Sequence, residues 1–175
     1  MTVLIYALAW WLTSASDADA LRRTAPAYLD ATSARAHLAA ARVAGVAHRL
    51  DPYLLLAIAY RESRYDPNAV TREKSGKLSC GLLMTTEPLG VPCPPPSIIG
   101  GYLAGAAHLD EWRRATGSLH AGLLGYAGGY AMLRACGRGP IVRERAGVEV
   151  DLCSTPEVAR ARWMRRLVER RGAEG

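Results

Sequence analysis

The sequence contains no phenylalanine, although half of its 175 residues are hydrophobic. Aromatic packing therefore depends on eight tyrosines and four tryptophans. Runs of β-branched residues are scarce, whereas Ala, Leu and Arg are plentiful, and this balance favours helices over strands. The length suits one domain and is short for two. We expect a single all-α domain with a complete hydrophobic core.

Metal and nucleotide motifs are missing too. None of the four cysteines forms a CxxC pair, and no histidine stands near them at the spacing of a zinc site. The segment GRGP at 137–140 lacks the strand–turn–helix context of a phosphate-binding loop. The sequence predicts no metal and no cofactor.

The four cysteines, Cys80, Cys93, Cys136 and Cys153, allow three pairings. Short loops close at the least entropic cost, which favours the disulfides Cys80–Cys93 and Cys136–Cys153. The alternative is four free, buried thiols in a reducing compartment.

No apolar run reaches the roughly 20 residues that a membrane-spanning helix needs. The stretch 3–12 is apolar, and Ala18-Asp19-Ala20 has the A-x-A pattern of a cleavage site, although no Lys or Arg precedes it. We predict a signal peptide over 1–20 and an exported domain over 21–175, in the periplasm or outside the cell, with no stable membrane span after cleavage. The alternative is an ordinary N-terminal helix.

The formal net charge of +6 favours a polyanionic partner: nucleic acid, anionic lipid or a cell wall that bears carboxylates. The arginines are spread over several expected helices, and no basic stripe is interleaved with aromatic residues. We therefore expect the cell wall as partner and no nucleic acid.

Periodicity and capping signals predict five helices. Asp51 is a good N-cap and Pro52 suits the first helical position, so a helix is expected to begin there. A linker is expected over 21–31 and a glycine-containing loop over 137–154. A long irregular loop, with room for a short helix or strand pair, is expected over 69–96. The expected helices span 33–49, 52–64, 97–116, 118–136 and 155–171.

Glu62 is the principal candidate for a functional residue. It lies three, four and seven positions after Ala59, Ile58 and Leu55, so all four share one helix face. A carboxyl group at the end of an apolar face has a raised pKa, because burial disfavours its charged form. Such a group can act as a proton donor. The alternative is a structural Glu paired with Arg61, Arg64 or Arg72.

Three segments together resemble the lysozyme-like lytic transglycosylases of the soluble type. The family has a buried helix ending in Glu-Ser, then a G-L-M-Q-like and an A-Y-N-x-G-like segment. This chain has DPYLLLAIAYRESRYDPNAV at 51–70, CGLLMTT at 80–86 and GYAGG at 125–129. The resemblance spans roughly residues 33–136. Met84 stands where the family has Gln, and Ala127 where it has Asn.

The resemblance implies a lysozyme-like helical fold, with a long active-site loop that the cysteines would staple. It implies cleavage of the β-1,4 bond between N-acetylmuramic acid and N-acetylglucosamine in peptidoglycan, with Glu62 as acid and then base and without a second carboxylate or a metal. Asp66 and Glu73 are expected to be surface charges. The residues expected to contact substrate are Ser63, Gly81, Met84, Tyr126 and Gly129.

Other readings remain open. Ser63 and Tyr126 also fit purely structural roles, and Tyr65, Trp112 and Tyr130 fit either sugar stacking or packing. A hydrolytic lysozyme would act on the same bond, and a wall-binding protein on a decayed fold would bind glycan without cleaving it. A cationic nucleic-acid or membrane binder ranks third. The expected partner is a peptidoglycan glycan strand, bound by a monomer.

Overall fold

The computed structural model describes residues 13–145 and 148–172. It is mostly helical, with 61% of residues in helices and two disulfides, so the expected helical class is confirmed. Two small antiparallel sheets accompany the helices, which the all-α expectation did not include. The chain divides into two compact units, Met1–Ala106 with Glu157–Gly175, and Ala107–Pro156.

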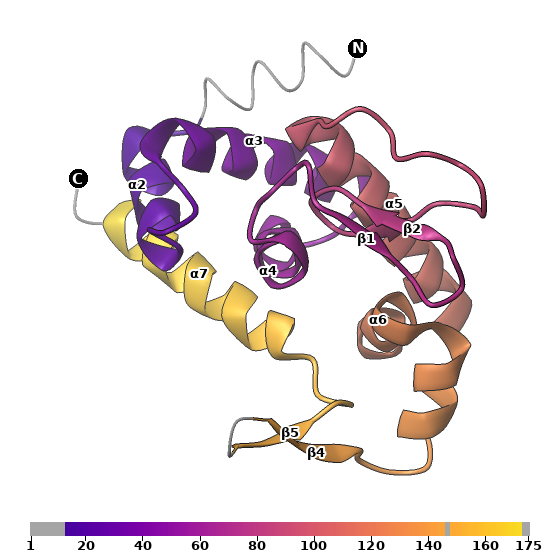
Figure 1. The fold of residues 1–175 in the computed structure, drawn as a ribbon. Helices are drawn as coiled ribbons and strands as arrows, with labels where there is room; N and C mark the ends of the chain where they lie inside the picture. The colour runs from indigo at the N-terminus through magenta and orange to yellow at the C-terminus, as the bar shows by residue number, and fades with distance from the viewer. Residues whose placement is uncertain (1–12, 146–147, 173–175) are drawn as a thin grey trace. The chain divides into compact units, whose positions relative to one another are not determined.

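The first unit contains three helices that follow one another in sequence and pack in that order: α2 (Ala15–Thr24), α3 (Ala31–His48) and α4 (Pro52–Ser63). Asp30 caps α3 through the backbone N–H of Ser33, and Asp51 caps α4 through that of Tyr53. The last helix, α7 (Pro156–Gly172), returns to this unit (Figure 1). Arg160 donates a hydrogen bond to the backbone oxygen of Thr24, and Arg165 pairs with Asp51.

Helix α2 corrects the prediction for the N-terminal region. The linker expected over 21–31 is wrong for its first part, because α2 continues to Thr24 and Leu21 is buried. The predicted cleavage site after Ala20 falls within this helix. Arg42 of α3 forms a salt bridge with Asp17, 2.9 Å away. The apolar stretch 3–12 lies outside the described residues, and cleavage stays a prediction.

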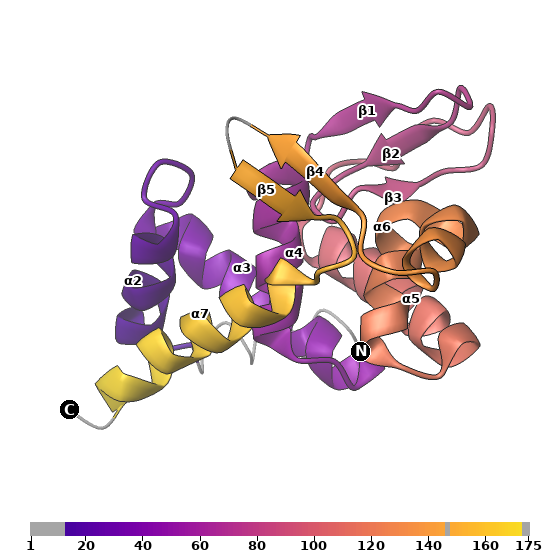
Figure 2. The same ribbon diagram turned by 90° about the horizontal axis from the view of Figure 1, so that it is seen from below.

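The segment after α4 forms a three-stranded sheet within the loop expected over 69–96, where a short helix or strand pair was allowed for. Strands β1 (Val70–Arg72), β2 (Leu78–Cys80) and β3 (Thr85–Thr86) pair antiparallel in that order (Figure 2). Val70 lies opposite Cys80, and Cys80 lies opposite Thr85. The strands are only two or three residues long, too short to produce a clear alternation in the sequence.

Helix α5 (Ile98–Thr116) runs from the first unit into the second. Its first half packs on the turn after β2, where Leu82 and Leu83 are buried. Gly101 and Gly105 make this close approach possible, because a Cβ at either position would press against Leu82 or Leu83.

The second unit contains the rest of α5, then α6 (Leu119–Cys136) and a hairpin of β4 (Val142–Arg145) and β5 (Val148–Asp151). The hairpin replaces part of the loop expected over 137–154. Helix α6 departs from helical geometry at Gly128 and Gly129.

Both disulfides have the predicted pairing, Cys80–Cys93 in the first unit and Cys136–Cys153 in the second. All four cysteines are thus bonded. Over the described part of the chain, no helix is both long and apolar enough to cross a bilayer.

Candidate functional site

Glu62 lies in the last turn of α4, a helix that is buried from Tyr53 to Ala59. Leu55, Ile58 and Ala59, which share its face, are at most 2% exposed. The Glu62 side chain itself is 25% exposed, so its carboxyl group lies at the boundary between core and solvent. Burial raises the pKa of Glu62, and the nearby Arg61 guanidinium opposes this shift without cancelling it.

The chain turns sharply after Glu62 without a glycine. Arg64 and Tyr65 both adopt left-handed backbone conformations, with φ of 59° and 67°. Asp66 then accepts a hydrogen bond from the backbone N–H of Asn68, which fixes the following turn. Two consecutive left-handed non-glycine residues are strained, so packing must hold the end of α4 in place.

Arg61 connects Glu62 to a second carboxylate that sequence reasoning missed. Its Nε lies 3.5 Å from Oε1 of Glu62, and its Nη1 pairs with Oε1 of Glu157. Glu157 comes from the first turn of α7, and its side chain is only 3% exposed. Local patterns in the sequence do not reveal this pair, because Glu157 lies 96 positions after Arg61.

The other proposed partners of Glu62 are engaged elsewhere. Arg64 donates to the backbone oxygen of Tyr60 and lies over the Tyr60 ring. Arg72 donates to the backbone oxygen of Gly76. Of the three arginines considered as partners of Glu62, Arg61 is the one that pairs with it, at 3.5 Å, and Arg61 also pairs with the more deeply buried Glu157.

Ser63 joins the end of α4 to the second motif. Its hydroxyl lies 2.8 Å from the backbone oxygen of Leu82 and 3.1 Å from that of Ala59, and donates to them. This arrangement matches the structural role considered for Ser63, a hydroxyl bonded to backbone. It also places the 81–84 turn against the helix end that bears Glu62.

The 81–84 turn is built by two left-handed residues. Gly81 has φ of 72° and Met84 has φ of 49°. The N–H of Gly81 donates to Ala69, 2.7 Å away, and the N–H of Met84 donates to Gly81. A Cβ on Gly81 would meet no atom closer than 3.8 Å, so lack of space does not explain the glycine. The positive φ of Gly81 explains it, because glycine adopts the left-handed conformation at no steric cost.

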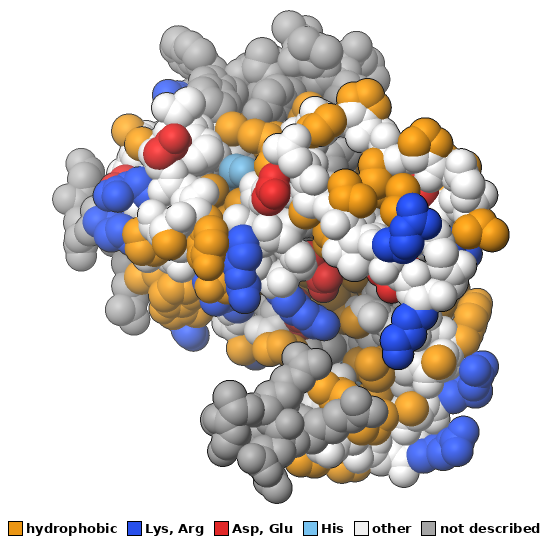
Figure 3. Space-filling model, viewed as in Figure 1, with side chains coloured by type: hydrophobic (Ala, Val, Ile, Leu, Met, Phe, Trp, Pro, Cys, Tyr) orange, Lys and Arg blue, Asp and Glu red, His pale blue; other side chains and the backbone are white. Residues whose placement is uncertain are grey.

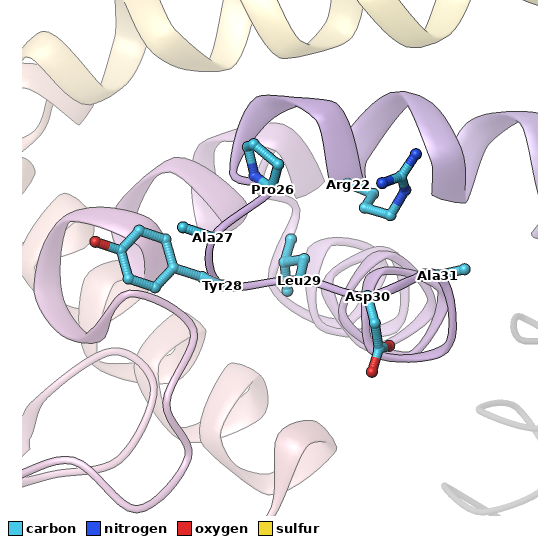
Figure 4. A pocket seen from close by; sticks show the side chains of 7 residues that line it. All are labelled: Arg22, Pro26, Ala27, Tyr28, Leu29, Asp30 and Ala31. Atoms are coloured by element: carbon cyan, nitrogen blue, oxygen red, sulfur yellow. The ribbon is translucent and has the colours of Figure 1, made fainter.

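Two hollows in the first unit do not include Glu62. A mostly apolar cavity of about 490 Å³ is bordered by Gly81, Thr85, the Cys80–Cys93 disulfide, the prolines 94–96 and the start of α5. A shallow depression after α2 is lined by Arg22 and residues 26–31, with the Tyr28 ring pointing outward (Figure 4). Of the residues expected to contact substrate, Gly81 lines the first hollow.

Tyr126 and Gly129 belong to the second unit. Tyr126 is half-buried, with its ring 5.2 Å from that of His108. Gly129 has φ of 61° at the kink of α6, and open space surrounds it. Tyr65, in contrast, is only 4% exposed and packs against His37, so sugar stacking by Tyr65 is excluded.

Charge on the face shown in Figure 3 is dispersed. Lys and Arg side chains are scattered among neutral and apolar ones in the view of Figure 3, without forming one stripe. Among the described residues, no three His, Cys, Asp or Glu side chains gather as a metal site would require. No known protein family, curated protein or solved structure matches the chain.

Proposed function

We propose that this protein is a peptidoglycan lytic transglycosylase of lysozyme-like fold, exported to the periplasm or beyond, with Glu62 as acid and then base. The observation that carries the proposal is a carboxyl group with raised pKa, at the boundary between core and solvent, joined by Ser63 to the second motif. The order of the three motifs in the sequence supports the same function.

The chemistry follows from one carboxyl group. Protonated Glu62 donates its proton to the oxygen between N-acetylmuramic acid and N-acetylglucosamine, and the C1–O bond breaks. The carboxylate of Glu62 then takes the proton of the muramoyl 6-hydroxyl as that oxygen bonds to C1. The product is a 1,6-anhydro ring, Glu62 is protonated again, and no water is consumed.

Arg61 and Glu157 have supporting roles in this scheme. The guanidinium beside Glu62 stabilises the carboxylate that exists between the two proton transfers. Glu157 keeps that guanidinium in place. Because Glu157 is buried and ion-paired, it does not meet the needs of a nucleophile or of a base that activates water. This favours the transglycosylase over a two-carboxylate hydrolase.

The test is digestion of purified peptidoglycan by the full chain, in water enriched in oxygen-18, with mass spectrometry of the products. A transglycosylase releases anhydro ends without the heavy oxygen, whereas a hydrolase places it at the new reducing end. Release of labelled reducing ends would replace the proposal by the hydrolytic lysozyme. Binding without any release would replace it by the wall-binding protein.

Glu62→Gln is expected to lower turnover by about 10²–10⁴, because Gln cannot donate and recover a proton. The matched control is Glu73→Gln, an exposed carboxylate that accepts a hydrogen bond from Ser79 and is expected to keep turnover. A Glu62→Gln protein with normal turnover, or one that no longer folds, contradicts the assignment.

The direction in which Glu62→Gln changes the melting temperature can be predicted from the pKa of Glu62. The folded-state pKa of Glu62 lies above its ordinary value of 4.5, so ionisation of Glu62 disfavours the folded state. Stability present below pH 4.5 is lost as the pH rises through the folded-state pKa. Glu62→Gln should therefore melt at or above the wild-type temperature at pH 7 and lose any advantage at low pH.

A further inference from the structure

Two aromatic rings of the second unit form an exposed surface, called here the aromatic platform: Trp112 of α5 and Tyr130 of α6. Their centroids are 5.0 Å apart, with the rings inclined by 63°. Tyr130 is 64% exposed and Trp112 is half-buried. An exposed Tyr that rests edge-on against another ring offers a flat apolar face to solvent.

The neighbours of the platform hold it in position. The indole Nε1 of Trp112 donates a hydrogen bond to Nε2 of His108, 3.3 Å away. Gly125 lets α6 lie flat on the Trp112 ring, because a Cβ at Gly125 would overlap it. The kink at Gly128 and Gly129 comes just before Tyr130, so Tyr130 does not continue the register of the first half of α6.

The nearby charged groups of α5 are negative or paired with a carboxylate. Burial lowers the pKa of His108, so its imidazole is neutral at pH 7. Glu111, 77% exposed, lies 3.9 Å from Nδ1 of His108. The nearby guanidinium groups of Arg113 and Arg114 both pair with Asp110. This environment suits a neutral ligand better than a polyanion.

We propose that the aromatic platform binds a neutral pyranose unit of a glycan strand, an N-acetylhexosamine, by stacking on Tyr130 and Trp112. The axial C–H groups of a pyranose form an apolar face that packs on an aromatic ring, while its hydroxyls stay in water or reach the Tyr130 hydroxyl. The choice of a peptidoglycan-type sugar rests on the proposed function, whereas the stacking rests on the platform alone.

The test measures binding of a soluble β-1,4-linked tetrasaccharide of N-acetylglucosamine by calorimetry, in the Glu62→Gln protein so that cleavage cannot interfere. Tyr130→Ala is expected to weaken binding about tenfold, and Tyr130→Trp to retain it, because one stacked ring is lost or replaced. The matched control is Tyr28→Ala, which removes a tyrosine of similar exposure in the first unit and should leave affinity unchanged.

Unchanged affinity in Tyr130→Ala would overturn the platform, and so would equal losses in Tyr130→Ala and Tyr28→Ala. A single-stranded oligonucleotide that binds through Tyr130 while the tetrasaccharide does not would overturn the sugar as ligand. Peptidoglycan cleavage by the wild type is scored separately. Cleavage without a Tyr130 effect therefore rejects the platform alone, and tetrasaccharide binding through Tyr130 without cleavage rejects the proposed function alone.

Discussion

Helices α4 and α6 carry most of the predicted site residues, and they differ in where their geometry changes. Helix α4 is regular and buried up to its last turn, and Glu62 lies where the burial ends. Helix α6 is buried over 122–125 and is interrupted at Gly128 and Gly129, after which Tyr130 is exposed. Burial in the first unit changes the ionisation of a carboxyl group, whereas the interruption in the second turns an aromatic ring toward solvent.

The largest effect on stability is expected when the guanidinium group of Arg61 is removed from the first unit. Arg61→Met leaves the Glu157 carboxylate buried and unpaired, which is expected to cost about 3–5 kcal/mol of unfolding free energy. Urea unfolding followed by circular dichroism measures it. Adding Glu157→Gln should recover most of the loss.

Arg64→Met is the matched control for that experiment. It removes an exposed guanidinium from the next turn, and its expected cost is about 1 kcal/mol or less. Equal losses in Arg61→Met and Arg64→Met would show that Glu157 does not depend on Arg61.

Each of the two disulfides is expected to stabilise the unit that contains it. Each closes a loop of similar length, with separations of 13 and 17 residues, and each is expected to contribute about 3 kcal/mol. Hydrogen exchange should separate them. Replacing Cys136 and Cys153 by Ser should expose the amides of β4 and β5, whereas Ser at Cys80 and Cys93 should leave α4 protected. Loss of α4 protection in the variant with Ser at Cys80 and Cys93 would show that core packing alone does not stabilise the first unit.

Acid should weaken the first unit through His37. This residue is 2% exposed, its Nδ1 lies 3.2 Å from the Tyr102 hydroxyl, and burial lowers its pKa from 6.5 to about 4. The unfolded chain binds the proton more readily, so stability falls as the pH drops from 6.5 to about 4, by roughly 3 kcal/mol. His37→Gln should remove this part of the pH dependence of chemical unfolding, and an unchanged slope would contradict the assignment.

The smallest expected effect comes from the two positions that depart from the family pattern, one in each unit. Met84→Gln and Ala127→Asn each add a side chain able to hydrogen-bond to sugar, and each is expected to raise turnover by about two- to tenfold. Met84 is half-buried and Ala127 is exposed, so the fold should tolerate both. Rates of anhydro-muropeptide release measure the effect, and lower rates in both variants would show that the native residues suit the substrate.

Local signals in the sequence predicted several features of the structure. The Asp51-Pro52 start placed α4 to within a residue, since capping depends only on neighbours. The apolar spacing of Leu55, Ile58 and Ala59 placed Glu62 on a buried face, because helical periodicity is set by the backbone alone. The disulfide pairing followed from the closure of short loops.

Which side chains meet across long sequence separations depends on tertiary packing. It brought Glu157 to Arg61, buried Tyr65 against His37, left Tyr130 exposed beside Trp112 and made strands of two or three residues. None of these features has a local signal in the sequence, because the burial of a ring or a carboxylate depends on residues that are distant in the chain. Local patterns in the sequence were sufficient for helices α3 to α7 and for the buried face that bears Glu62, whereas long-range packing set the partners of Arg61 and Glu62.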